Sequence, residues 1–388
     1  MRQSVLIVGG GIAGLVLARA LAQQGIDVDL LERSPSLRAE GAGITLGANA
    51  MRALAGIGVG AAVAARGRAM GVAAITDASG RVLSMTDLAG IAARHGDAYA
   101  IHRTDLHEVL AQGLEHAGDL HGARVRVTCG TTVRDFVSTP TGVEVVRSDG
   151  VTGHHRAMIG ADGVRSAVRA LAFGAIEPRY AGYTCWRWTG AVAGGLERAV
   201  EMWGEGKRVG LVPLVGEQVY AFMVANAPRG TAGEHGAATV ASVRERFAAF
   251  GGPFTAVAAA MGDGQQRLLH HDIEEIELPR WHDGPVGLIG DAAHAMTPNF
   301  GQGAAMAIED AVVLARELVA HVRAADAFHA WAQRRRARVD DIQRGARRLG
   351  AIAQWESPLA CWARDLLVRI TPASRASRTI ESIVAYVA

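Results

Sequence analysis

Two apolar runs separated by a glycine-rich turn and a helix-length segment open the chain. Residues 5–8 (Val-Leu-Ile-Val) form a continuous aliphatic run, which is typical of a strand covered on both faces. Residues 12–24 have the length and apolar character of a packed helix, and the next run, residues 28–31, ends in Glu32. The pattern predicts a strand, a tight turn, a helix and a second buried strand.

The pattern changes in the middle of the chain. Two short apolar runs at residues 72–75 and 82–85 flank an Asp-Ala-Ser-Gly turn signal and predict a hairpin. Helical spacing follows over residues 103–117, and strands are expected at 125–127, 143–146 and 154–159. From about residue 180 to 276, short alternating strands predict a mainly antiparallel sheet, interrupted by a helix over residues 238–250.

Residues 286–289 return to a buried-strand pattern, which leads into a predicted helix from about 301 to 320 and a helical C-terminus. We therefore predict an α/β fold with a Rossmann-like nucleotide-binding domain, an inserted mainly antiparallel β-sheet substrate domain and C-terminal helices. The expected boundaries are 1–70, 100–172 and 280–330 for the first domain, 71–99 and 173–279 for the second, and 331–388 for the helices.

Composition narrows the classes of function. The 388 residues carry 40 basic and 38 acidic side chains, so the net charge of +2 gives no reason to expect a nucleic-acid or anionic-membrane partner. Glycines interrupt the apolar N-terminal stretch, which argues against a membrane span. Three distant cysteines form no metal spacing or disulfide framework, so we expect a cytoplasmic protein without a metal site. The arginine run at 334–336 is interpreted as a solvated face.

The first turn has the form that dinucleotides require. Gly9 permits the tight turn, Gly11 lets the backbone approach a pyrophosphate, and Gly14 lets the helix pack closely on the strand. The helix then points its first amides at the phosphates. Glu32 follows Gly14 by eighteen residues and can accept hydrogen bonds from ribose hydroxyls. By itself the motif does not separate FAD from NAD; the residues assigned to it are Gly9, Gly11, Ile12, Ala13, Gly14 and Glu32.

Two further motifs give the chain a family resemblance. Residues 159–169 read Ile-Gly-Ala-Asp-Gly-Val-Arg-Ser-Ala-Val-Arg, and residues 290–298 read Gly-Asp-Ala-Ala-His-Ala-Met-Thr-Pro, followed by Gly-Gln-Gly at 301–303. With the first turn, in this order, they resemble the flavoprotein monooxygenases of the para-hydroxybenzoate hydroxylase superfamily (group A). The resemblance covers essentially the whole length.

The third motif also makes chemical sense for a flavin. Asp291 follows a buried strand, where ligands bind in α/β sheets, and can hold a hydroxyl of the ribityl chain. Pro298 fixes a loop against the isoalloxazine, and Gly301, Gln302 and Gly303 begin a helix whose free N–H groups stabilise the negative charge of reduced flavin. Because only FAD reaches from Glu32 to this loop, FAD is the expected cofactor.

The resemblance implies further contacts. For the cofactor these are Arg33, Gly43, Arg103 and Asp162; Asp162 could equally cap a helix, and Arg103 could equally be a surface residue. The middle domain resembles the urate hydroxylase, zeaxanthin epoxidase and salicylate hydroxylase branch. That branch implies substrate contacts by Arg208, Tyr220, Trp186 and Pro298, although tryptophans on a sheet are more often core.

The implied activity is an FAD-dependent monooxygenase that consumes O2 and either NADH or NADPH and hydroxylates a planar aromatic or heteroaromatic molecule through a C4a-hydroperoxyflavin. The same chemistry could instead serve epoxidation, N-oxygenation or Baeyer–Villiger oxidation, including antibiotic modification, or the chain could be a non-oxygenase flavoprotein. No side chain is assigned as catalytic, and His270, His271 and His294 are interpreted as structural. We expect a monomer or homodimer.

Overall fold

The computed structural model describes residues 4–38, 41–114, 118–234, 240–262 and 268–388. Its first sheet has seven strands in the order β19-β20-β13-β1-β2-β9-β8. β1 pairs in parallel with β2 and with β13, and β20 extends the parallel set beyond β13. The strands of this sheet are β1 (Val5–Val8), β2 (Val28–Glu32), β8 (Gly118–Leu120), β9 (Ala123–Cys129), β13 (Ala157–Gly160), β19 (His282–Asp283) and β20 (Val286–Leu288).

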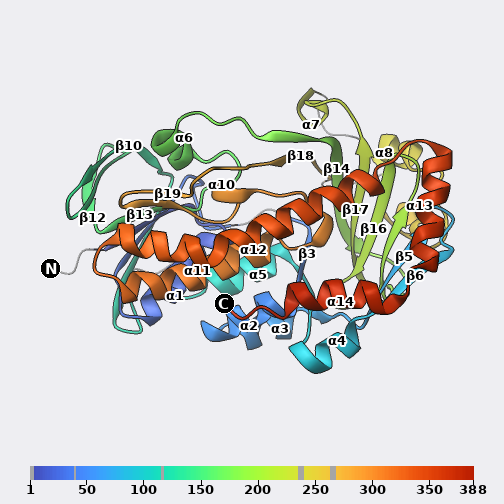
Figure 1. Cartoon of the computed structure of the whole chain (residues 1–388), viewed down its shortest axis with the longest axis horizontal. Coiled ribbons are helices and arrows are strands. Elements are labelled where there is room, and N and C mark those ends of the chain that lie inside the picture. Colours follow the sequence, from blue (N-terminus) through green and yellow to red (C-terminus); the bar gives the residue numbers. More distant parts are fainter. Residues whose placement is uncertain (1–3, 39–40, 115–117, 235–239, 263–267) are drawn as a thin grey trace.

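Helices α1 (Ile12–Gln23) and α11 (Gly303–Ala320) pack against each other on this sheet, and α12 (Ala324–Ala353) covers α11. Ten of the twelve residues of α1 are buried, which explains its nearly continuous apolar sequence. Figure 1 shows α11 and α12 running side by side, with α12 continuing toward the second sheet. Helix α12 therefore contacts both sheets: it packs on β19 and β20, and its Arg347 donates to Glu275 in the second sheet.

The second sheet also has seven strands, in the order β18-β14-β17-β16-β15-β5-β6. Every pair is antiparallel except β15 with β5. One face carries a separate apolar core, closed by residues of helices α8 and α9. The elements are β5 (Val72–Asp77), β6 (Val82–Asp87), β14 (Arg179–Ala191), β15 (Ala199–Trp203), β16 (Lys207–Pro213), β17 (Gln218–Asn226), β18 (Leu269–Glu275), α8 (Val240–Arg246) and α9 (Pro253–Ala260).

Two three-stranded sheets and shorter helices complete the described chain. Helices α13 and α14 follow α12 and lie along the edge of the second sheet and beneath it in Figure 1. These elements are β3 (Gly43–Leu46), β4 (Arg68–Ala69), β7 (Tyr99–His102), β10 (Val133–Thr139), β11 (Gly142–Arg147), β12 (Thr152–His155), α2 (Ala48–Gly56), α3 (Gly60–Arg66), α4 (Leu88–His95), α5 (Arg103–Ala111), α6 (Ala167–Phe173), α7 (Thr231–Glu234), α10 (Asp291–His294), η1 (Pro298–Phe300), α13 (Pro358–Ile370) and α14 (Ala373–Val384).

The predicted fold class is confirmed, and the local differences have physical reasons. The expected strand over 154–159 is split at Arg156, because β12 pairs with β11 while β13 pairs with β1 and β20 in another sheet. The expected helix from residue 103 ends at Ala111, and residues 115–117 lie outside the described chain, as do residues 238–239 of the helix expected over 238–250. No helix among the described residues is both long and apolar enough to cross a bilayer.

The interpretation of residues 334–336 as a solvated face is wrong for Arg335. This side chain is fully buried and donates to Asp310 (Nε to Oδ1, 2.8 Å) and to Glu309 (Nη1 to Oε2, 2.5 Å). Asp310 also accepts from the Gly290 amide at 3.2 Å, and its Oδ2 lies 2.5 Å from Nε2 of His294. Burial would raise the pKa of Asp310, but His294 and Arg335 outweigh it and lower the pKa to about 2.

We expect Arg335→Met to lower the free energy of unfolding by about 3 kcal/mol, because it removes the cation that bonds both buried carboxylates and leaves Glu309 with Arg338 and Asp310 with His294. The measurement is urea unfolding at neutral pH. The matched control is Arg334→Met, which removes an exposed arginine 2.9 Å from Glu317 and should cost no more than about 1 kcal/mol. Equal losses in the two variants would contradict the structural role of Arg335.

Candidate active site

In the glycine turn between β1 and α1, the fold requires glycine at positions 9 and 14, whereas Gly11 has open space beside its backbone. Gly9 has a φ of +111°, and a Cβ there would lie 2.4 Å from the carbonyl oxygen of Ala161. A Cβ on Gly14 would lie 1.9 Å from the carbonyl oxygen of Gly9. A Cβ on Gly11 would meet no atom within 4 Å. Gly11 therefore presents an open backbone face at the N-terminus of α1, where Ile12 and Ala13 begin the helix.

Glu32 lies at the end of β2, beside this turn. Its Oε2 accepts from the Gly10 amide at 2.7 Å, and its Oε1 accepts from the Ser34 amide at 2.8 Å. These two bonds orient the carboxylate and leave each oxygen a further lone pair for a hydroxyl donor. Glu32 is partly exposed, and the neighbouring Arg33 is exposed.

A buried histidine supports the turn from the other side. His107 on α5 lies with its Nε2 2.8 Å from the carbonyl oxygen of Gly10. Sequence reasoning missed this residue. The available signal was its position on the same helical face as apolar residues of the predicted helix.

The second half of the site begins where β20 ends. Gly290 has a φ of +58° and Asp291 opens α10. The Asp291 carboxylate is exposed and makes no hydrogen bond or ion pair with any residue in the described ranges. An exposed carboxylate directly beyond a buried strand is available to accept a ligand hydroxyl.

The loop after α10 leads to the N-terminus of α11. Pro298 begins the short helix η1, and Gly301 ends it with a φ of +62°. Gln302 precedes the first helical residue, Gly303, and its Oε1 accepts from Nδ2 of Asn49 at 3.0 Å. The same Asn49 nitrogen donates to Glu309 at 2.6 Å. Because the first amides of a helix have no partner within it, they are available to a ligand next to this loop.

Three other predicted cofactor residues have structural contacts of their own. The Asp162 carboxylate accepts from the Ser166 hydroxyl and from the amides of Ala167 and Val168 at the start of α6, so the helix-capping alternative describes its contacts. Burial raises the pKa of Asp162, although these hydrogen bonds oppose the shift. A Cβ on Gly43 would lie 2.4 Å from the Cβ of Tyr220, so Gly43 allows β3 to approach the second sheet. The exposed Arg103 lies against Gly41.

One face of the second sheet carries Arg187 and Tyr220, and this face is turned toward β3 and the segment before it. Thr189 lies opposite Tyr220 and Arg187 lies opposite Phe222, so these four side chains share a face. Nη1 of Arg187 lies 3.4 Å from Nδ1 of His271, and the positive charge of Arg187 acts on the nearby Tyr220 phenol. Burial raises the pKa of Tyr220 to about 12 against the opposing effect of Arg187, so its phenol is neutral and its oxygen can donate or accept.

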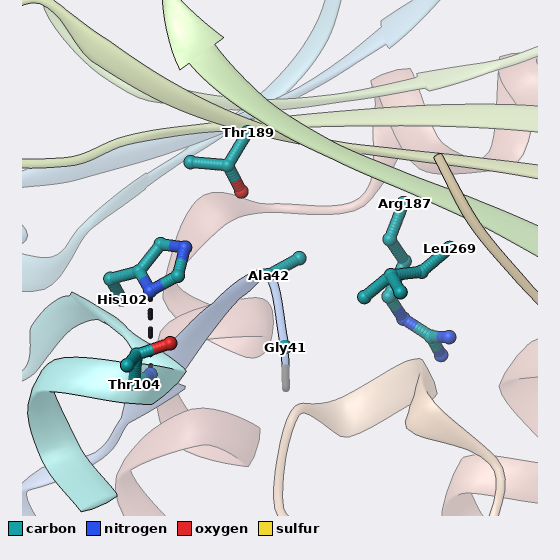
Figure 2. A pocket seen from close by; sticks show the side chains of 7 residues that line it. All are labelled: Gly41, Ala42, His102, Thr104, Arg187, Thr189 and Leu269. Carbon is teal, nitrogen blue, oxygen red and sulfur yellow. Dashed lines mark hydrogen bonds between the residues drawn. The ribbon is translucent and has the colours of Figure 1, made fainter. Parts of the chain in front are cut away.

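A cavity of about 300 Å³ lies on this face. Figure 2 shows Arg187 and Thr189 extending from the strand toward the Gly41–Ala42 segment, with Leu269 beside Arg187 and His102 across from Thr189. Nδ1 of His102 accepts from the Thr104 amide at 3.3 Å. Sequence reasoning did not select Arg187, because it stands between two tryptophans in an apolar strand.

Arg208 is held by protein partners. Its Nε donates to Gln354 (2.8 Å), its Nη1 to Glu201 (2.9 Å) and its Nη2 to Asn299 (2.7 Å), and the side chain is buried. Asn299 lies next to Pro298, so Arg208 ties the sheet to this loop and to the end of α12. These contacts favour a positioning role over the predicted direct contact with a substrate.

Trp186 does not lie in this cavity. It lies on the opposite face of the sheet, stacked on His270 with ring centroids 4.4 Å apart and edge-on to Phe247 in the core under α8 and α9. The expectation that it lines a substrate pocket is not supported, because strand side chains alternate between faces and Arg187 occupies the other one. His270 contacts the Thr184 hydroxyl at 2.8 Å, and His294 is bound to Asp310, so both have structural contacts.

The described residues fit FAD. The open backbone at Gly11 suits a pyrophosphate, Glu32 is oriented for a ribose, and the exposed Asp291 precedes a loop that ends at free helix amides. A nucleotide with adenosine at one end and isoalloxazine at the other would contact both halves.

Comparisons with known proteins agree with an FAD site. The model of the family "FAD binding domain" matches residues 2–345. The chain is 37% identical to 2-heptyl-3-hydroxy-4(1H)-quinolone synthase of Pseudomonas aeruginosa (95% of this chain, 94% of that protein) and 38% identical to aurachin C monooxygenase/isomerase of Stigmatella aurantiaca (96% and 95%). The crystal structure of Klebsiella pneumoniae HpxO with FAD and uric acid superposes with a TM-score of 0.88 at 28% identity, covering 99% of this chain and 97% of that one.

The site geometry and these likenesses lead to the same conclusion. The chain belongs to the FAD-binding monooxygenases of the para-hydroxybenzoate hydroxylase superfamily, and it is an FAD-dependent enzyme of the type that hydroxylates aromatic or heteroaromatic molecules.

Proposed function

We propose that the chain hydroxylates the heteroaromatic ring of a 4(1H)-quinolone with an alkyl group at carbon 2. The observation that carries this proposal is the Arg187 guanidinium that lines the cavity, on the same sheet face as the neutral Tyr220, since a guanidinium can bind the ring's carbonyl oxygen. The full-length identity to a relative named for a 3-hydroxylated 2-alkyl-4(1H)-quinolone supports the choice of ring.

The chemistry of the quinolone matches this arrangement. The ring nitrogen donates electron density through carbon 2 to carbon 3, so carbon 3 is the nucleophilic position. Bound FAD would supply the capacity to accept a hydride from NADH or NADPH and to activate O2. One oxygen atom is inserted into the carbon 3–hydrogen bond and the other leaves as water, with one NAD(P)H and one proton consumed. The pyridine nucleotide visits transiently, because the chain offers it no second glycine turn.

The protein itself would position the substrate and exclude water from the cavity. Arg187 would donate to the carbonyl oxygen, and His271, 3.4 Å from Nη1, would orient the guanidinium. Ala42 and Leu269 give the cavity apolar walls. The first amides of α11 would stabilise negative charge at the pyrimidine end of the flavin. Cys185 and Cys361, which form no disulfide, support the proposal of a cytoplasmic location, where NAD(P)H is supplied.

The test compares ring classes on the purified yellow protein. NADH and NADPH oxidation is followed with 2-heptyl-4(1H)-quinolone, uric acid, 3-hydroxybenzoate and 6-hydroxynicotinate, and products are identified by mass and NMR. We expect the quinolone to give coupled oxidation and a carbon-3 hydroxylated product. Coupled turnover of another ring and none of the quinolone would contradict the proposed substrate, and an N-oxide product would favour the N-oxygenation alternative.

We expect Asp291→Ala to weaken FAD binding by about 10- to 100-fold, because a hydrogen bond to a charged group contributes about 1.5–3 kcal/mol. The measurement is titration of the apoprotein with FAD, followed by flavin fluorescence. Asp283→Ala is the matched control, since Asp283 is an exposed carboxylate before the same strand rather than after it. The assignment of Asp291 fails if both variants bind FAD as the wild type does.

Arg187→Met should raise the KM for the quinolone by about 10- to 100-fold while FAD remains bound, because the carbonyl oxygen loses its charged donor. Steady-state kinetics and the flavin absorbance spectrum measure the two effects. Arg179→Met on the same strand is the control, since that arginine is exposed and pairs with Glu275. An unchanged KM in Arg187→Met would contradict the assignment of Arg187 as a contact of the substrate.

A further inference from the structure

Helix α13 has its polar and apolar faces reversed relative to an ordinary surface helix. Its inner face carries Arg364, which is only 2% exposed. The Arg364 Nη1 donates to the carbonyl oxygens of Gly204 (3.2 Å) and Ala353 (3.3 Å), and its Nε donates to Asp365 (2.8 Å). The guanidinium also lies 5.2 Å from the centre of the Trp203 ring. The inner face of this helix thus carries a charged group beside Cys361, the other buried residue of α13.

The outer face of α13 is apolar. Leu359 is 74% exposed and Trp362 is 63% exposed. The exposed apolar residues recur at helical spacing and form one stripe: Leu359, Trp362, Leu366, Leu367 and Ile370. The last turn of α12 adds the exposed side chain of Ile352, and the connection from α12 to α13 adds that of Trp355. We call these seven residues the α13 stripe. Scattered single apolar side chains are ordinary on a surface, but a continuous stripe indicates a binding surface.

Unpaired cations flank the α13 stripe at both ends. Arg348 lies one helical turn before Ile352, Arg369 lies within α13, and Arg375 and Arg378 lie on α14, which begins three residues after α13 ends. All four arginines are exposed, and within the described ranges none forms an ion pair. Among the acidic side chains nearby, Asp365 pairs with Arg364, and Glu381 pairs with Arg94 and His95. Glu356 accepts from the Asn226 amide, and the exposed Glu205 forms no ion pair within the described ranges, so the four arginines outnumber the unpaired carboxylates.

We propose that the α13 stripe binds the surface of a lipid bilayer that contains anionic lipids. Leucine, isoleucine and tryptophan side chains would enter the boundary between headgroups and acyl chains, and the four arginines would contact lipid phosphates. A second copy of the chain fits less well, because a symmetric contact would bring two sets of unpaired arginines together. The near-neutral net charge of the whole chain conceals this local concentration of positive charge.

The experiment is co-sedimentation of the FAD-loaded protein with vesicles. One set contains phosphatidylcholine and phosphatidylglycerol in a three-to-one ratio, and the other contains phosphatidylcholine alone. We expect the protein to sediment with the anionic vesicles and the partition coefficient to fall by about tenfold at high salt, because screening removes the contribution of the arginines. Without phosphatidylglycerol, binding should weaken by a similar factor.

Trp362→Ser combined with Leu367→Ser should lower the partition coefficient by about tenfold or more, since two apolar side chains no longer enter the bilayer. The matched control combines Val137→Ser and Val322→Ser, which remove exposed valines from β10 and from the turn after α11. The FAD content of each variant reports whether it is folded, and Leu359→Ser alone replaces the double variant if FAD is lost.

Three results would overturn the proposal. The first is a wild-type protein that sediments with neither vesicle set. The second is a double variant that binds as the wild type does. The third is a dimer, seen by light scattering, that the double variant converts to a monomer, because the stripe would then be an interface between copies. The proposal does not depend on the identity of the oxidised substrate.

Discussion

The positive charge of Arg335 joins segments of the chain that would otherwise repel or separate. Glu309 and Asp310 are adjacent, fully buried carboxylates on α11, and Arg335 on α12 hydrogen-bonds both. Through Asp310 the cation holds the Gly290 amide, which directly precedes Asp291. Through Glu309 it holds Asn49, which in turn binds Gln302 at the start of α11. Both ends of the predicted flavin loop are therefore fixed by one buried ion cluster.

The second sheet adds the substrate side of the site by simple alternation. Side chains on β14 point alternately to the α8–α9 core and to the cavity, so Trp186 and Trp188 enter the core while Arg187 and Thr189 enter the cavity. The absence of a side chain on Gly43 lets β3 meet Tyr220 closely. Arg208 then connects this sheet to Asn299 in the loop after α10. Contacts between segments that are distant in the sequence thus fix the position of the cofactor loop relative to the cavity.

The parts that could be predicted from the sequence are those determined locally. Gly9 permits a backbone conformation with positive φ, and Gly14 permits close packing of α1 on the turn after β1. The sequence therefore predicts the order of strand, turn and helix. The residues of the cavity are harder to predict from the sequence. Trp186 and Arg187 are adjacent on one strand, and a shift of one residue moves a side chain to the opposite face of the sheet. Arg335 could not be identified within three consecutive arginines, because its burial depends on where α12 packs. Arg208 has partners more than ninety residues away in two of its three contacts, at Asn299 and Gln354.

The central claim is that flavin and substrate meet between the loop at Pro298 and the sheet face that carries Arg187. A crystal structure with FAD and 2-heptyl-4(1H)-quinolone tests it most directly. The account predicts the isoalloxazine beside the N-terminus of α11 and the quinolone carbonyl oxygen within hydrogen-bond distance of Arg187. A quinolone bound elsewhere, with Arg187 still bonded to His271 and the cavity filled by side chains, would contradict it.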